Sequence, residues 1–173
     1  MNTVRWWCAV VVAGLVLAPV ARAQQPPKPG PEHDMLKKME GTWDATMKMG
    51  GMESKGTMVY KMDLGGLWLT SAFEGEVLGT KFFGKGLDTY DAGKKKYIGI
   101  WADSMSTSPM VSEGTYDAEK KALTMTGEGP GPDGKPAKHT MVTVQKDDDT
   151  MVMDMFMGDS KESMFTITFK RKK

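Results

Sequence analysis

Residues 42–49, after Gly41, read TWDATMKM, and this stretch decides the fold class because its side chains alternate in character. An apolar face carries Trp43, Ala45, Met47 and Met49, and a polar face carries Asp44, Thr46 and Lys48. A period of two is typical of a β-strand with one buried face. The glycines at 50 and 51 then predict a tight turn.

The same pattern continues to the end of the chain. Further strands are expected over 53–62, 66–74, 79–90, 94–102, 110–117, 121–128, 138–146, 149–157 and 162–171. Short strands at this spacing, without intervening helices, indicate an antiparallel barrel or sandwich. We expect an all-β, up-and-down antiparallel barrel of about ten strands, because closing the sheet leaves no exposed edge.

The residues before this region predict three segments. Residues 32–39 form the one good helix candidate, with an apolar stripe at Met35, Leu36 and Met39. Residues 24–31 read QQPPKPGP, and four prolines in eight residues block helix and sheet, so we expect an extended tether. The barrel domain is therefore expected over 32–173.

Residues 1–23 have the three parts of a secretory signal peptide. Arg5 provides the positive charge, an apolar stretch follows, and Ala21-Arg22-Ala23 fits the small-residue cleavage site. The apolar stretch is shorter than the roughly 20 residues that span a bilayer. We expect cleavage before Gln24, a periplasmic or secreted protein, and no membrane span after signal removal.

Charge and cysteine content exclude several classes of function. The chain carries 23 Lys and Arg against 22 Asp and Glu, and removal of Arg5 and Arg22 leaves 21 against 22. A nearly neutral chain argues against nucleic-acid binding. The single cysteine, Cys8, lies in the signal, so the mature protein is expected to have no disulfide and no thiolate chemistry.

The first and last strands are expected to meet. Arg171 ends the apolar face of the last strand, and an arginine there needs a buried partner. Its planar cation stacks well on an aromatic ring. We expect it to pack on Trp43, since the first and last strands are neighbours in a closed barrel.

Together these residues resemble a known signature. A short helix, Gly41-Thr42-Trp43 and the closing Arg171 are similar to the calycins, which include lipocalins, fatty-acid-binding proteins and avidins. A closer resemblance, to the bacterial family called domain of unknown function 1579, rests on four motifs. They are His33-x-x-Leu36-x-x-Met39-x-Gly41-x-Trp43, Gly86-Leu87-x-x-Tyr90-Asp91 with Lys95-Lys96-Tyr97, Trp101-x-Asp103-Ser104-x-Ser106-Thr107, and Ser112 to Asp117. The resemblance implies a calycin-like barrel and transfers no activity.

Methionine is unusually abundant. Sixteen of the 17 methionines follow residue 23, as many as all leucines, isoleucines and valines there together. The simplest interpretation is a pliable core, because methionine fills irregular gaps. Two alternatives stay open: an adaptable lining for apolar ligands, or a Cu(I) site. The thioethers considered for copper are Met47, Met49, Met52, Met151, Met153, Met155 and Met157.

The preferred ligand-binding residues lie on one expected strand. Tyr97, Trp101 and Asp103 share a face, with Gly99 leaving open volume between the two rings. Two aromatic rings and one carboxylate are typical of an apolar pocket with one orienting group. The alternative is that the rings pack a filled barrel and Asp103 belongs to a turn. If the Tyr97 face points inward, Ile98 and Ile100 cover the outer face against the helix or a loop.

We therefore expect an exported, monomeric barrel that binds a small apolar or amphipathic molecule. The alternatives are an enzyme of unknown reaction on the same barrel, or an envelope module without a small ligand. For an enzyme, the candidates are Ser104, Ser106 or Ser108 with His139 and Asp103, or a carboxylate pair of Asp103 and Glu113. No motif identifies a catalytic residue, and neither a cofactor nor a metal is predicted; His33 and His139 alone do not form a metal site.

Overall fold

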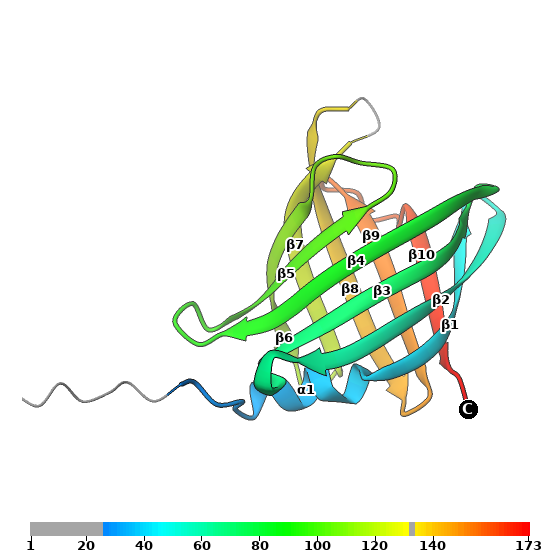
Figure 1. Cartoon of the computed structure of the whole chain (residues 1–173). Helices are drawn as coiled ribbons and strands as arrows, with labels where there is room; N and C mark the ends of the chain where they lie inside the picture. Colours follow the sequence, from blue (N-terminus) through cyan, green and yellow to red (C-terminus); the bar gives the residue numbers. More distant parts are fainter. Residues whose placement is uncertain (1–25, 132–133) are drawn as a thin grey trace, which may run out of the picture.

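The computed structural model describes residues 26–131 and 134–173. In this part of the chain one α-helix precedes ten β-strands (Figure 1). The elements are α1 (Glu32–Met39), β1 (Gly41–Met49), β2 (Met52–Asp63), the 3-10 turn η1 (Leu64–Gly66), β3 (Trp68–Val77), β4 (Thr80–Asp91), β5 (Lys96–Asp103), β6 (Met110–Asp117), β7 (Ala122–Pro130), β8 (Pro136–Asp147), β9 (Thr150–Met157) and β10 (Phe165–Arg171). The predicted helix and the predicted number of strands are confirmed.

The strands form a closed antiparallel barrel. Each strand pairs with the next one in the chain, and β10 returns to pair with β1. The predicted up-and-down barrel is therefore confirmed. Gly50 and Gly51, which connect β1 to β2, have φ angles of 54° and 82°, the left-handed values that a two-residue hairpin turn requires.

The helix covers one end of the barrel, which we call the helix end (Figure 1). Leu36, 1% exposed, and Met35 pack with Leu69, Tyr97 and Leu123 in a cluster beneath α1. A second cluster surrounds Trp43 and contains Ala45, Met58, Met151 and Phe169. The apolar stripe of the helix thus buries itself against the inner faces of the strands.

Gly41, Trp43 and Arg171 join the helix to the barrel. Arg171 is the register partner of Trp43, and its guanidinium carbon lies 4.1 Å from the centroid of the Trp43 ring. The same guanidinium donates hydrogen bonds to the carbonyls of Lys38 (2.9 Å) and Glu40 (2.6 Å), at the carboxyl end of α1. The expected contact is present, and it also satisfies carbonyls that a helix end leaves without partners.

Gly41 makes this arrangement possible. Its φ of +132° disfavours other residues, and a Cβ there would lie 2.5 Å from Nη1 of Arg171. The Trp43 indole donates to the Met39 carbonyl at 2.8 Å, so both members of the stacked pair hold the end of the helix. The sequence Gly-x-Trp is therefore explained by the docking of α1.

The predicted signal peptide, residues 1–23, lies outside the described residues. Of the predicted tether, residues 26–30 have no regular secondary structure. No helix within 26–131 or 134–173 combines the length and the apolar character that crossing a bilayer requires.

Candidate ligand-binding cavity

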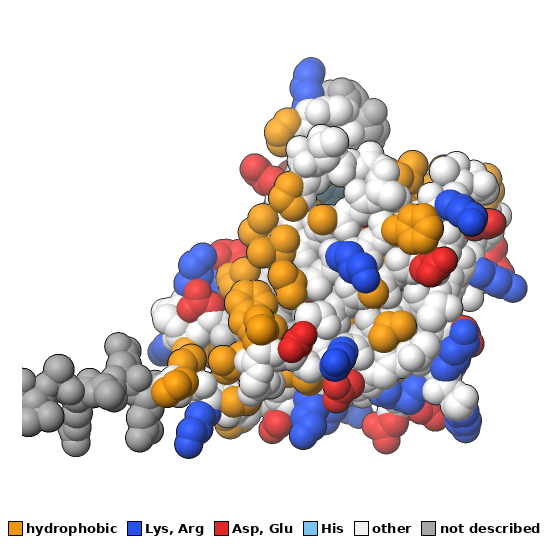
Figure 2. All heavy atoms as spheres, viewed as in Figure 1, with side chains coloured by type: hydrophobic (Ala, Val, Ile, Leu, Met, Phe, Trp, Pro, Cys, Tyr) orange, Lys and Arg blue, Asp and Glu red, His pale blue; other side chains and the backbone are white. Residues whose placement is uncertain are grey.

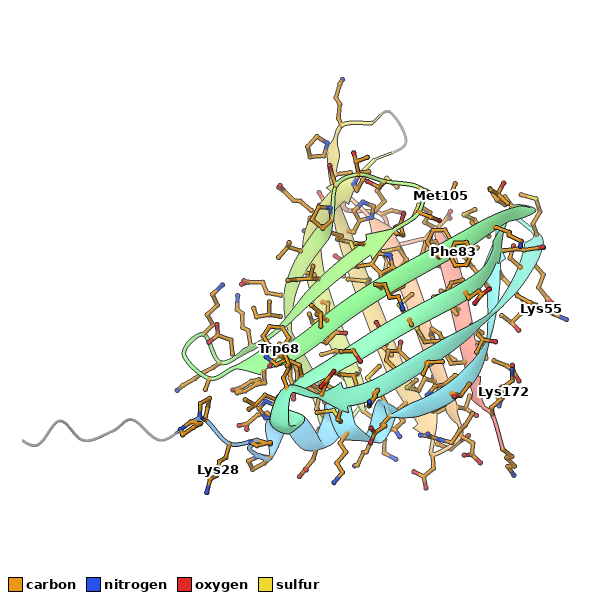
Figure 3. The ribbon with its side chains drawn as sticks, in the orientation of Figure 1. Lys28, Lys55, Trp68, Phe83, Met105 and Lys172 are labelled. Carbon is orange, nitrogen blue, oxygen red and sulfur yellow. The ribbon has the colours of Figure 1, made fainter. Side chains whose placement is uncertain are left out.

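The barrel contains an internal cavity of about 440 Å³. It extends from Leu36 and Met39 of α1 to exposed residues at the opposite end, which we call the loop end. Met105, 63% exposed, marks the loop end in Figure 3. Ligand pockets typically have volumes of about 300–1,000 Å³, so the cavity could hold a small molecule.

The wall of the cavity is mostly apolar and rich in methionine. Its thioether-bearing residues are Met39, Met47, Met49, Met58, Met105, Met110, Met125, Met141, Met153, Met155 and Met164. The aromatic residues Phe73, Phe82, Trp101, Phe165 and Phe169 complete much of the remaining surface. Methionine is therefore used here to line a space as well as to fill a core, and its flexible side chain suits a wall that adapts to a ligand.

Asp88 is the most unusual polar group in this wall. It lies on β4 and faces inward, so the surface that it leaves accessible belongs to the cavity. Among the described residues no hydrogen bond or ion pair to its carboxyl group is present. Burial raises the pKa of Asp88 to about 7, because the ionised form is poorly solvated there.

Several neutral polar groups lie near Asp88. Ser71 is the register partner of both Tyr60 on β2 and Gly86 on β4, two residues from Asp88. Burial and the nearby charge of Asp88 raise the pKa of Tyr60, which therefore stays a neutral hydroxyl. Ser112, 5% exposed, lies on the other side, and its hydroxyl donates a long bond of 3.5 Å to the Gly99 carbonyl. These hydroxyls give the apolar cavity a small polar region.

Gly99 keeps this polar region open. The register aligns Asp88, Gly99, Ser112, Gly127 and His139 in one row across β4 to β8. A Cβ on Gly99 would lie 2.7 Å from Oδ1 of Asp88 and 3.0 Å from Oγ of Ser112. Any larger side chain would therefore displace the carboxyl group or cover it.

The structure separates the three residues predicted to bind the ligand. Trp101 and Asp103 line the cavity, as does Gly99. Tyr97, 5% exposed, instead packs beneath α1 and does not line the cavity. Its hydroxyl donates to the Glu32 carbonyl at 2.9 Å, so it anchors the helix.

The expected donors to a ligand are already engaged. The Trp101 indole donates to Oδ2 of Asp103 at 3.1 Å, and Oδ1 of Asp103 accepts from the Met105 amide at 2.9 Å. Asp103 thus begins the turn after β5 while it also holds the indole in place. Trp101 and Asp103 therefore line the cavity with their polar atoms already paired, whereas the carboxyl group of Asp88 is unpaired among the described residues.

The outer face of β5 differs from the expectation. Ile100 is 37% exposed and is aligned with two exposed neighbours, Leu87 at 39% and Val111 at 53%. Hydrophobic side chains gather on the side of the barrel shown in Figure 2. Neither the helix nor a loop covers Ile100, because α1 docks at the barrel end rather than on its side.

The enzyme candidates do not assemble into a catalytic group. Ser106 donates to the Ser108 carbonyl, and His139 contacts the Pro130 carbonyl, so no described hydrogen bond joins serine to histidine. Glu113 pairs with Lys96 on the outer face, and its pKa is lowered chiefly by the hydrogen bond from this lysine. It therefore does not form a pair with Asp103.

The two histidines occupy different parts of the fold. His33 lies in α1, where its Nδ1 accepts from the Gly30 amide at 3.1 Å. His139 lines the cavity on β8. Among the described residues, no three His, Cys, Asp or Glu side chains gather as they would around a metal ion.

The fold defines a small ten-stranded β-barrel with an internal cavity. The chain belongs to the family described as "Protein of unknown function (DUF1579)", whose model matches residues 28–171. The resemblance expected from the four sequence motifs is confirmed. No curated protein matches the chain.

Solved structures share the barrel at low sequence identity. The crystal structure of Rv2717c from M. tuberculosis is 13% identical, with a TM-score of 0.59 over 83% of this chain and 99% of that one. A redesigned β-barrel is 17% identical, with a TM-score of 0.46 over 80% and 96% of the two chains. The redesigned barrel mFAP1, bound to DFHBI, is 15% identical, with a TM-score of 0.45 over 79% and 98%. The similarity to Rv2717c supports the fold alone.

Proposed function

We propose that this protein is exported and binds a small apolar or amphipathic molecule inside its barrel. The observation that carries the proposal is the cavity of about 440 Å³ with an unpartnered carboxyl group, Asp88, in an apolar wall. Apolar surface provides affinity for such a molecule, and a few convergent polar groups orient it. The export proposal rests on the three-part pattern of residues 1–23.

The cavity weighs against a purely structural role. A barrel that served only as a scaffold would gain stability from filling its interior, since each cavity costs packing energy. Here the glycine at 99 lines the cavity, where a larger side chain would reduce the open space beside Asp88 and Ser112. An open cavity of this size is more consistent with a binding function.

Asp88 also supports a second candidate, an enzyme that uses this group as an acid or base. A carboxyl group with a pKa of about 7 suits proton transfer near neutral pH. However, a reaction also requires a second reactive group in a suitable position, and no described side chain is hydrogen bonded to Asp88. Binding is therefore the function that the site supports best.

The test uses the apolar fluorophore Nile red as a probe. We expect saturable binding of one molecule per barrel, with a blue-shifted emission as the dye leaves water. Gly99→Leu should reduce the affinity at least tenfold, because the leucine fills the space beside Asp88. Ala102→Leu is the matched control, since Ala102 is exposed on the same strand and points outward.

Circular dichroism must show that both variants keep the barrel. Equal affinity of folded Gly99→Leu and the wild type would place the binding site outside the cavity. A similar loss in Ala102→Leu would show that the dye binds the outer surface of β5. Either outcome would contradict the proposed function.

A further inference from the structure

His139 has a buried nitrogen with no partner. The side chain is 6% exposed, and its Nε2 lies 3.2 Å from the Pro130 carbonyl oxygen. A carbonyl only accepts, so Nε2 carries the proton and Nδ1 presents a lone pair. Nδ1 is buried without a hydrogen bond among the described residues. Buried polar atoms nearly always have a partner, so this nitrogen indicates a group that binds there.

The ring orientation shows on which side this group would lie. Cδ2 of His139 is 3.3 Å from the position of a Cβ on Gly129, and Nε2 contacts the carbonyl of Pro130, also on β7. The Cδ2–Nε2 edge therefore faces β7. Because Nδ1 belongs to the opposite side of the ring, it is turned toward β9, the other neighbour of β8.

Three methionines lie near His139 on the same inner face, two on β9 and one on β8 itself. The register pairs His139 with Met157, and Met141 with Met155. Met141 and Met155 line the cavity with His139, so all four side chains share the inner face of β8 and β9. We call these four residues the Met–His block. Paired Cβ atoms are about 5 Å apart across strands, and alternate residues about 6.6 Å apart along a strand.

The thioethers leave the Nδ1 lone pair without a donor, because a methionine sulfur carries no hydrogen. They are, however, soft metal ligands, and flexible methionine side chains can converge over these separations. A metal-bound histidine usually donates its second N–H to a carbonyl or carboxylate, as Nε2 of His139 does here. The chemistry of the donors therefore matches a soft cation.

We infer that the Met–His block binds one Cu(I) ion, or its analogue Ag(I), through Nδ1 of His139 and the thioethers of Met141, Met155 and Met157. The site lies toward the loop end of the cavity, whereas Asp88 lies on the opposite part of the wall, on β4. The inference does not depend on the proposed binding of an apolar molecule. It also uses a different group of methionines from the one on β1, because Met141, Met155 and Met157 lie on β8 and β9 with His139.

The first test needs no variant. The mature wild-type protein is labelled with methyl-¹³C methionine and ¹⁵N histidine and titrated with Ag(I), which avoids redox reactions. At one equivalent we expect shifts at Nδ1 of His139 and at the methyl groups of Met141, Met155 and Met157. Met58, buried on β2, and Met52, 55% exposed, should not shift. Uniform shifts, or first binding at Met52 or Met105, would overturn the inference.

The second test measures Cu(I) affinity by competition with bicinchoninate. Replacing Met155 and Met157 by leucine should weaken binding at least tenfold, because leucine keeps the volume but removes the sulfur. The matched control replaces Met47 and Met58, two cavity-lining methionines of β1 and β2. Equal weakening in both double variants would contradict the site. If the variant that lacks Met155 and Met157 does not fold, the Ag(I) titration of the wild-type protein still tests the site.

Discussion

At the scale of single residues, Arg171 carries the largest number of separate interactions at the helix end. It stacks on Trp43, donates to the Lys38 and Glu40 carbonyls, and donates through Nε to the Asp148 carbonyl at 3.0 Å. Hydrogen bonds from charged groups contribute more than neutral ones. Arg171 thus connects α1, β1 and the β8–β9 turn around a single side chain.

We predict that Arg171→Ala lowers the free energy of unfolding by about 2–4 kcal/mol. The stacking contributes about 1 kcal/mol, and the helix carbonyls lose charged donors worth about 1.5–3 kcal/mol in total. Urea denaturation measures the change. Arg171→Lys is the control. Its stability should lie between those of the wild type and Arg171→Ala, because lysine keeps the positive charge but lacks the planar guanidinium group. An unchanged stability of Arg171→Ala would mean that the C-terminal residues do not hold the helix.

Asp88 makes stability depend on pH. Its pKa is about 7 in the folded protein, against about 3.9 for an unfolded aspartate. Between these values the folded state binds more protons than the unfolded state. The free energy of unfolding therefore falls as pH rises from about 4 to 7, by up to about 4 kcal/mol, and this contribution stays constant at higher pH.

We predict that Asp88→Asn removes this fall. The variant should match the wild type near pH 4 and be more stable at pH 8, since the amide never ionises. Urea denaturation at both pH values measures the difference. Glu113→Gln is the control, because Glu113 is a solvent-facing carboxylate whose pKa is lowered by Lys96. Parallel pH profiles of Asp88→Asn and the wild type would show that Asp88 is ionised and solvated throughout.

At the scale of elements, turn residues explain why the strands could be predicted from the sequence. The expected and observed bounds agree for the helix and for β6, and differ by a few residues elsewhere. The expected strand 94–102 begins at Lys96 because Asp91 accepts from the amides of Gly93 and Lys94. Such side-chain turns extend a loop at the expense of a strand.

The inner face of β5 was predictable, but Asp88 on β4 was not recognised. On β4 the alternation is misleading, because Leu87 points to solvent and Asp88 points inward. A signal was available in the pairing of the two strands. Once the Gly99 face of β5 is inside, the turn at 92–95 pairs Tyr90 with Tyr97 and Asp88 with Gly99. Asp88 was not recognised because its position depends on the register between β4 and β5, and the periodicity of a single strand does not determine that register.

The lone pair of His139 shows the same limit. Its position on an inner strand face follows from alternation, but its tautomer depends on the Pro130 carbonyl of the neighbouring strand. Its methionine neighbours likewise depend on the register of β8 with β9. The sequence therefore indicated methionine-rich strands, whereas the grouping of one histidine with three of these methionines required the structure.

At the scale of the whole molecule, alternation cannot distinguish a filled barrel from a hollow one. Both have apolar residues on the inner face, and only the balance of side-chain volumes decides. Here Gly84 and Gly86 give their space to the Trp101 ring, while Gly99 leaves space in the cavity beside Asp88 and Ser112. The inner glycines thus accommodate one large ring and leave the cavity beside it.

The proposed export belongs to the scale of the whole chain, because removal of the signal peptide must leave the barrel domain complete. The helix begins at Glu32 and the family match begins at residue 28, so cleavage before Gln24 leaves both in the mature chain. We predict that the protein recovered after export starts at Gln24. Intact-mass measurement of the periplasmic and membrane fractions tests this.

A matched Ala23→Pro variant should block cleavage and keep the full-length chain in the membrane fraction, because signal peptidase requires a small residue at that site. Wild-type protein that retains Met1 in the membrane fraction would instead identify residues 1–23 as an anchor.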